Sequence, residues 1–333
     1  MPGFESIIDQ KRPIRILTTC LRNGNIPHAL LFTGISGIGK RTTASLFSKA
    51  CNCESLASGV SRERLDEIPC CRCRSCRKIK SGNHPDIIHI KPSGNIIKIA
   101  QIRNLCHTLS MKPYEAKTRV VTISEAQNLN LEAGNALLKV LEEPPEQTII
   151  ILTALNTANL LPTIVSRCQE IRFGPISRKN LMRLLHDERG TETDVARIIA
   201  AMANGSISKA LAMSDDQWIN QRNWLIHELE ILESRSIRGV MAFAEKLSSK
   251  KDKLPDAFEV ILTWLRDLWM VGMDPEKIVN TDRIDGVQSN SGRVPPSSLL
   301  SKITAVQRAQ KELQTHTNLR LMLENLMLQL VKI

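Results

Sequence analysis

The sequence predicts an α/β domain built on a parallel sheet with helices on both faces, followed by an all-helical region. Short apolar runs alternate with segments of helical spacing up to Pro175. Residues 148–153 form a near-continuous apolar run, which is typical of a parallel strand covered on both faces. After Pro175 the strand signals vanish, whereas helical spacing continues to Ile333.

The elements of the predicted sheet follow one another in a regular order. A helix is expected over residues 4–22, before the helix stop Asn23-Gly24, and further helices are expected over 44–50, 100–109 and 131–142. The strands are expected at residues 29–32, 87–90, 119–123, 148–153 and 170–173. A parallel five-stranded sheet with crossover helices accounts for this order.

The chain is long enough for several domains, and we expect three. Residues 1–175 form the α/β domain with a cysteine-bearing module at about 51–80, residues 176–214 a small three-helix domain, and residues 215–333 a helical domain. Residues 282–298 are predicted to be a loop because they are rich in Ser, Gly, Asn and Pro. The expected helical core includes Trp218, Trp224, Trp264, Trp269 and the stripe Leu319, Met322, Leu323, Leu326, Leu330 and Val331.

Composition narrows the class of partner. The net charge of +11 and the pI near 9.3 favour a polyanionic partner. The alternative is a basic surface that only keeps the protein soluble. Aromatic residues are only 3% of the chain, with Tyr114 the single tyrosine, so binding by base stacking is not expected and a nucleic acid would be held by its backbone. No apolar run is long enough for a membrane span or signal peptide, so a cytoplasmic protein with reduced cysteines is expected.

Residues 29–43 resemble a phosphate-binding loop. An apolar run leads into a turn with Gly34, Gly37 and Gly39, then Lys40 and a segment of helical spacing. The full pattern needs Ser or Thr after the lysine to ligate Mg²⁺, but Arg41 stands there, and Thr42 lies one residue too late. We therefore expect a loop suited to phosphate and ill-suited to Mg²⁺-dependent hydrolysis. The alternative is a glycine-rich turn with no ligand.

The cysteines predict a structural metal site. Cys70, Cys73 and Cys76 are spaced CxxCxxC, and Cys53 precedes them by a loop long enough to complete a tetrahedron. Four thiolates suit Zn²⁺ with no open position for catalysis. Cys51 and Cys71 compete as ligands, and an iron–sulfur cluster or free thiols are the alternatives.

The strand at 119–123 ends at Ser124 and Glu125. In nucleotide hydrolases an acidic pair at such a strand end holds Mg²⁺ and polarises water. Ser124 replaces the metal-binding aspartate, whereas Glu125 stands where the base would be. Together with Arg41, this predicts a site no longer needed for hydrolysis.

Arg167 lies just before the final strand, in the sequence Ser166-Arg167-Cys168. At this place the side chain can reach from the domain edge into a neighbour's nucleotide, where its charge would stabilise phosphoryl transfer in trans. The alternative is an ordinary surface arginine.

Taken together, these residues resemble the bacterial clamp-loader subunits of the AAA+ class. The matching stretches are FESIIDQ (4–10), NIPHALLFTG (25–34), the glycine loop, the cysteine insertion, NHPD (83–86), NALLKVLEEPP (135–145), SRC (166–168) and GSISKAL (205–211). The resemblance is dense over residues 4–213 and weak beyond them. It implies the AAA+ fold, a lid at 176–214 and a collar for oligomerisation at 215–333.

The family contains ATP-hydrolysing gamma/tau subunits and a delta-prime branch whose own site is commonly degenerate. Arg41 and Ser124 depart from the gamma/tau pattern, as do the apolar Ala154 and Leu155 near the first sensor. Ser208, with Lys209 beside it, stands where gamma/tau subunits carry the arginine of the second sensor. These departures match the delta-prime branch of the DNA polymerase III clamp loader.

The resemblance implies a subunit that helps to place the sliding clamp on primed DNA. Its expected partners are gamma/tau and delta subunits, the clamp and the backbone of primer-template DNA, and no membrane. Arg167 would complete a neighbour's ATP site, while Gly34, Gly37, Gly39, Lys40 and Thr42 would form a vestigial nucleotide loop without Mg²⁺. The alternatives are an active ATPase using Lys40, Thr42 and Glu125, and a zinc-dependent DNA-binding module.

Overall fold

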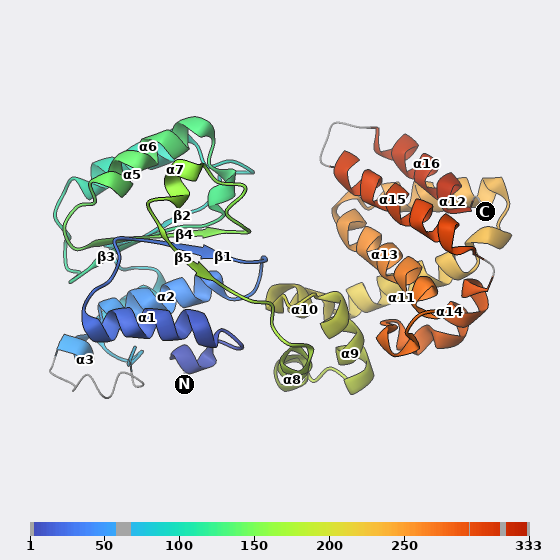
Figure 1. The fold of residues 1–333 in the computed structure, drawn as a ribbon, viewed down its shortest axis with the longest axis horizontal. Helices are drawn as coiled ribbons and strands as arrows, with labels where there is room; N and C mark the ends of the chain where they lie inside the picture. The colour runs from blue at the N-terminus through green and yellow to red at the C-terminus, as the bar shows by residue number, and fades with distance from the viewer. Residues whose placement is uncertain (1–2, 58–67, 293, 314–317, 332–333) are drawn as a thin grey trace. The chain divides into compact units, whose positions relative to one another are not determined.

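Figure 1 shows the chain as a computed structural model, which describes residues 3–57, 68–292, 294–313 and 318–331. The chain forms two compact units. The first comprises Met1–Asn180 and Gly205–Ser208, and the second comprises Leu181–Asn204 and Lys209–Ile333. The predicted fold class, a five-stranded α/β sheet followed by helices, is confirmed. The predicted boundaries of three domains stay predictions.

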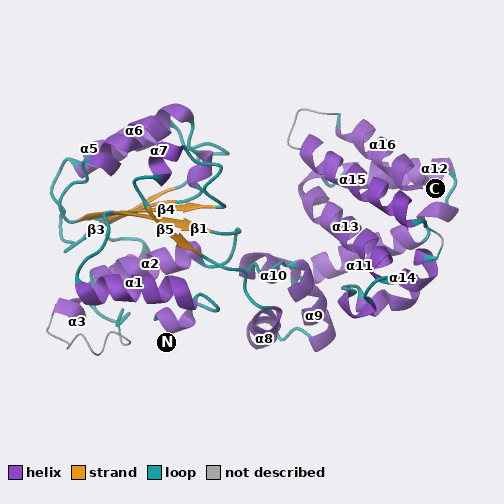
Figure 2. Ribbon diagram, in the orientation of Figure 1, coloured by secondary structure: helices purple, strands orange, loops and turns teal. Residues whose placement is uncertain are grey.

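A parallel sheet forms the centre of the first unit (Figure 2). Its strands lie in the order β2-β3-β4-β1-β5, and all neighbouring pairs are parallel. Every residue of β1, β3 and β4 is buried, including the polar Arg119 and Thr122 of β3, as is usual for parallel strands covered on both faces. The strand bounds are β1 (Ala29–Thr33), β2 (Ile87–Ile90), β3 (Arg119–Ile123), β4 (Thr148–Ala154) and β5 (Gln169–Arg172).

Two sets of helices cover the two faces of this sheet (Figure 1). Leu30 and Phe32 of β1 pack into the core with α1 (Lys11–Asn23) and α2 (Lys40–Cys51). Leu31, one position along, packs into the opposite core, because successive side chains of a strand point to opposite faces. That second face is covered by α5 (Ile99–Leu109), α6 (Leu131–Glu142) and α7 (Pro162–Val165), while the insertion after α2 carries α3 (Glu54–Ala57) and α4 (Arg74–Ser81).

The second unit is helical throughout its described residues. Four residues of the predicted stripe on the last helix are buried, Met322, Leu323, Leu326 and Leu330, whereas its end members Leu319 and Val331 are half-buried. Among the described residues, no helix combines the length and apolarity that crossing a membrane requires. Two helices have their first residues in the first unit and continue into the second, namely α8 (Arg178–Arg189) and α10 (Ile207–Met213). The other α-helices of the second unit are α9 (Thr193–Met202), α11 (Asp216–Glu230), α12 (Ile237–Ser248), α13 (Leu254–Met270), α14 (Ile284–Ser291), α15 (Pro296–Glu312) and α16 (Leu319–Val331).

The loop predicted over residues 282–298 is wrong, because this stretch contains α14 and the start of α15. Val287 is fully buried and anchors α14 in the helical core. Gly286 lies against the carboxylate of Glu230, so an added Cβ would require that side chain to move. Tertiary packing therefore overrides the weak helix propensity of Ser, Gly and Asn.

Two further expectations need correction. The helix predicted over 4–22 is instead a short 3-10 turn (Phe4–Ser6) followed by α1. The helix is interrupted because Asp9 has a positive φ of 57°. The side-chain amide of Gln10 also donates to the Gly174 carbonyl and accepts from the Gly174 N–H. Of the tryptophans predicted as core anchors only Trp264 is buried, whereas Trp218, Trp224 and Trp269 are half-buried.

Candidate functional site

A cavity of about 1030 Å³ lies where β1, β3 and β4 end in the first unit. This is the edge at which parallel α/β sheets bind ligands, because the loops after the strands diverge there. The cavity brings together residues from separate parts of the sequence. Its lining includes Gly37, Gly39, Lys40, Arg41, Thr42, Ser124, Glu125, Ala154, Leu155 and Ser208.

The glycines of the loop have conformations that the local packing requires. Gly37 and Gly39 have φ angles of 77° and 96°, in the left-handed region that other residues avoid. A Cβ on Gly37 would overlap the hydroxyl of Ser206 and come within 2.8 Å of the Cβ of Ser208. The loop can therefore approach residues 206–208 closely, and the Ser208 N–H donates to the Gly37 carbonyl at 3.2 Å.

Lys40 is the first residue of α2 and turns its side chain back onto the loop. Its Nζ donates to the carbonyls of Gly34 and, at 2.7 Å, Ile35. Burial lowers the pKa of Lys40 to about 8, although the charge of Glu125 opposes the shift. The ammonium group is thus held by backbone carbonyls at the place where a phosphate would compete for it.

In nucleotide hydrolases two positions of this cavity bind Mg²⁺, one after the loop lysine and one at the end of the third strand. Here these positions are occupied by Arg41 and Ser124, and neither has the side chain that binds the metal in hydrolases. Arg41 is on the first turn of α2, and its guanidinium cannot coordinate a cation. Ser124 follows β3 and is buried. Because this residue is a serine, the first carboxylate after the strand is that of Glu125. The carboxylate of Glu125 accepts a hydrogen bond from Asn128 Nδ2 at 3.2 Å.

Cationic side chains outnumber acidic ones in the cavity. Besides Lys40 and Arg41, the lining contains three lysines, whereas Glu125 is its one carboxylate among the described residues; the lysines are Lys49, Lys80 and Lys91. Burial, then the charges of Lys91 and Arg41, hold the pKa of His89 below its usual value. Sequence reasoning missed this cluster and the buried Thr122 hydroxyl, which has no hydrogen-bond partner among the described residues. The cavity therefore suits an anion.

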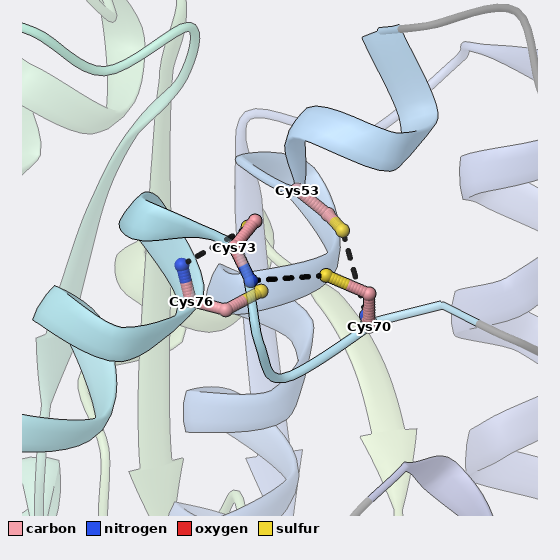
Figure 3. A group of neighbouring side chains, drawn as sticks. All are labelled: Cys53, Cys70, Cys73 and Cys76. Atoms are coloured by element: carbon pink, nitrogen blue, oxygen red, sulfur yellow. Dashed lines mark hydrogen bonds between the residues drawn. The ribbon is translucent and has the colours of Figure 1, made fainter.

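The structure brings together the four cysteines predicted as metal ligands (Figure 3). The Sγ atoms of Cys53, Cys70, Cys73 and Cys76 all lie within 4.8 Å of one another. Four thiolates around Zn²⁺ lie about 3.8 Å apart when each Zn–S bond is about 2.3 Å. The cluster thus has the donor type, the number of donors and the spacing of a closed zinc site.

The backbone around the cluster also favours thiolates. The N–H groups of Cys70, Cys73 and Cys76 donate to the sulfurs of Cys53, Cys70 and Cys73 at 3.5, 3.4 and 3.4 Å. A hydrogen bond from Cys76 lowers the pKa of Cys53 to about 4, and the same contact raises the pKa of Cys76. A bound cation would relieve this competition for one proton, because metal ligation requires all of the thiols to be deprotonated.

Cys51 and Cys71, the competing ligands, lie outside the four-cysteine cluster. Cys51 is buried at the end of α2, and burial raises the pKa of its thiol to about 12. The backbone at Cys71 has a positive φ of 55°, between the cluster members Cys70 and Cys73. Neither residue replaces a member of the cluster in this structure.

A buried carboxylate that sequence reasoning did not identify holds the segment beside the cysteine module. The carboxylate of Asp86 accepts hydrogen bonds from the N–H groups of Tyr114, Glu115 and Ala116, each at 2.8 Å. Arg119 lies 3.6 Å from it. Asp86 is the last residue of the NHPD stretch noted in the sequence, and these hydrogen bonds indicate a structural role for it.

Arg167 follows α7 and lies apart from the cavity of its own chain. It is not among the described residues that line the cavity. One guanidinium nitrogen donates to the Thr163 carbonyl at 3.0 Å, and the other lies 2.6 Å from the Glu142 carboxylate. About a third of the side chain is exposed, so the guanidinium is reachable from outside the unit. Sequence reasoning did not pair it with Glu142.

Comparisons with known proteins match both units. A family model described as "DNA polymerase III, delta subunit" matches residues 9–177, and one described as "DNA polymerase III, delta subunit, C terminal" matches residues 216–332. DNA polymerase III subunit delta' of Bacillus subtilis (strain 168) is 30% identical, with 96% of each chain covered. DNA polymerase III subunit tau of the same organism is also 30% identical, covering 83% of this chain and 48% of tau.

Among solved structures, a DNA polymerase III gamma subunit-related protein from Thermotoga maritima covers 95% of this chain and 98% of its own, at 18% identity. Its TM-score is 0.44, and this likeness carries no further conclusion.

Proposed function

The chain belongs to the DNA polymerase III delta subunit family, and from this premise we propose that it is a clamp-loader subunit that does not hydrolyse ATP itself. It assembles with gamma/tau and delta subunits and helps to load the sliding clamp on primed DNA. Its own contribution to catalysis is Arg167, which completes the ATP site of a neighbouring gamma/tau subunit.

The observation that carries the proposal is the loss of both metal positions in one cavity. Arg41 and Ser124 come from different elements, α2 and the end of β3, yet both line the space around the glycine loop. Mg²⁺-assisted phosphoryl transfer needs a hydroxyl and a carboxylate at those places. The remaining loop supports anion binding without the means for hydrolysis.

The rest of the molecule supports a part in a larger assembly. The helical unit has the size and architecture expected of a collar that holds subunits together, and the zinc site is structural, since its ligand set leaves no open position. The net charge of +11 suits contact with the DNA backbone within the complex.

Co-assembly tests the proposal directly. The purified chain is mixed with a gamma/tau subunit, and we expect a stable complex whose clamp- and DNA-dependent ATP turnover exceeds that of gamma/tau alone, while the isolated chain turns over no Mg²⁺-ATP. Turnover by the isolated, zinc-loaded chain would instead establish the active ATPase. Tight, salt-sensitive duplex binding without co-assembly would establish the DNA-binding module.

The charge of the cavity predicts nucleotide binding that is independent of Mg²⁺ and sensitive to pH. We expect the isolated chain to bind ATP about equally with Mg²⁺ and with EDTA, measured by calorimetry. Lys40 is cationic below its pKa of about 8 and loses its proton above it. Phosphate groups, with a second pKa near 6, keep their charge there. The dissociation constant should therefore rise by up to about 25-fold between about pH 7.5 and about pH 9.5, because the protonated fraction of Lys40 falls by about that factor.

Lys40→Arg is the matched variant for this experiment. An arginine stays charged to above about pH 12, so its binding should not weaken over the same interval. A requirement for Mg²⁺, or an equal pH dependence in both proteins, would contradict the assignment.

A further inference from the structure

Glu142 is the last residue of α6 and belongs to the stretch NALLKVLEEPP. No residue of this stretch, which the structure describes throughout, lines the cavity around the glycine loop. A carboxylate at the C-terminal end of a helix is locally unfavourable, because the unpaired carbonyls already carry partial negative charge there. A cation beside Glu142 offsets that cost. Arg167 is the cation that the structure places there, with a nitrogen 2.6 Å from Oε1.

The guanidinium of Arg167 has a second anchor on a different element. One of its nitrogens donates to the Thr163 carbonyl of α7 at 3.0 Å, while the other faces Glu142 on α6. The two helices pack closely, because Gly134 of α6 leaves room for the side chains of Leu161 and Ile164. The guanidinium is thus held between the ends of two helices, with Nη1 also donating to Ser166 Oγ at 3.5 Å, and about a third of the side chain is exposed.

We propose that Glu142 is a positioning residue, which holds Arg167 ready for the phosphates of a neighbouring subunit. The inference rests on the proposed role of Arg167 in trans. An arginine side chain loses rotamer entropy when it is placed, and a group that is already in position raises turnover more than a mobile one. Both side chains are partly exposed, and such pairs contribute little to stability, so the fold does not depend on this contact.

The opposite role predicts the opposite result. If Glu142 served only to neutralise Arg167, removing the carboxylate would free the guanidinium and raise turnover. If Glu142 positions the guanidinium through a hydrogen bond, glutamine at this place keeps most of the effect, because its amide oxygen accepts from the same donor.

The test uses the complex co-assembled with gamma/tau, with clamp and primed DNA present. We expect Glu142→Ala to lower kcat for ATP about tenfold with KM unchanged, and Glu142→Gln to lower it less than threefold. The neighbouring Glu143 is also exposed, so Glu143→Ala is the matched control and should match the wild type. The double variant Glu142→Ala with Arg167→Ala should be no slower than Arg167→Ala alone, because Glu142 acts through Arg167.

An unchanged or raised rate in Glu142→Ala, with Arg167→Ala slow, would overturn the positioning role and leave the proposed function intact. If Arg167→Ala itself matches the wild type, the trans role fails and this inference fails with it.

Discussion

Replacing Arg167 by alanine is expected to lower ATP turnover about 10³-fold at the neighbouring site that we propose it completes. An arginine supplied in trans stabilises the charge that builds up on the transferred phosphoryl group, and such residues contribute about 10³-fold or more. The side chain is partly exposed and its ion pair with Glu142 contributes about 1 kcal/mol or less to stability. The variant should therefore fold and co-assemble normally. Single-turnover ATP hydrolysis by the assembled complex measures the effect.

Arg172 provides the matched control for this experiment. It lies on the edge strand β5, is mostly exposed and pairs with Glu170 at 3.0 Å, so Arg172→Ala removes the same charge and a similar ion pair. We expect it to leave turnover within about twofold of the wild type. Arg167→Lys should recover only part of the rate, because lysine lacks the planar fork that matches phosphate oxygens. Equal rates for the wild type and Arg167→Ala would remove the trans role.

The sheet could be predicted from the sequence because its central strands are buried on both faces. The apolar run at 148–153 lacks the alternation of an amphipathic element, which indicates a strand buried on both faces. The strand β4 covers this run and extends one residue further, to Ala154. The cysteine module could be predicted for a similar reason, since CxxCxxC spacing restricts which sulfurs can meet. For the strand and for the CxxCxxC triplet the decisive information is local in the sequence, whereas Cys53 lies 17 residues before Cys70.

What the sequence could not predict depends on contacts between distant residues. Glu142 and Arg167 lie on different parts of the fold, and no pattern in the sequence around either residue predicts that they form an ion pair. The return of Lys40 onto the carbonyls of its own loop depends on the loop's conformation. The helix α14 depends on the burial of Val287, which outweighs its polar neighbours. Pairing and burial of this kind are set by the tertiary structure.

Replacing Cys76, a zinc ligand in our proposal, is expected to destabilise the first unit by roughly 4–5 kcal/mol or more, as the loss of a structural metal does. Cys76 is fully buried in α4, and with Cys53 and Ile79 it belongs to the same core as α1 and α2. Cys76→Ser should therefore lose its zinc, expose the insertion to proteolysis and lower the temperature of unfolding. Metal analysis and thermal unfolding of the purified chain measure these effects.

Cys71→Ser distinguishes the four-cysteine cluster from its rivals. Because Cys71 lies outside the cluster, the variant should keep its zinc; loss of the metal would show that the ligand set is different. The visible absorption of an iron–sulfur cluster in the wild type would contradict zinc.

Turnover should respond to these cysteine variants differently from stability. The cysteine module packs into the core on the α1 and α2 face of the sheet, whereas α7 and Cys168, next to Arg167, pack into the opposite core. At temperatures where Cys76→Ser remains folded, its complex with gamma/tau should therefore keep a near-normal rate per assembled complex. A rate as low as that of Arg167→Ala would mean that the module and the arginine are coupled through the sheet, contrary to a purely structural zinc.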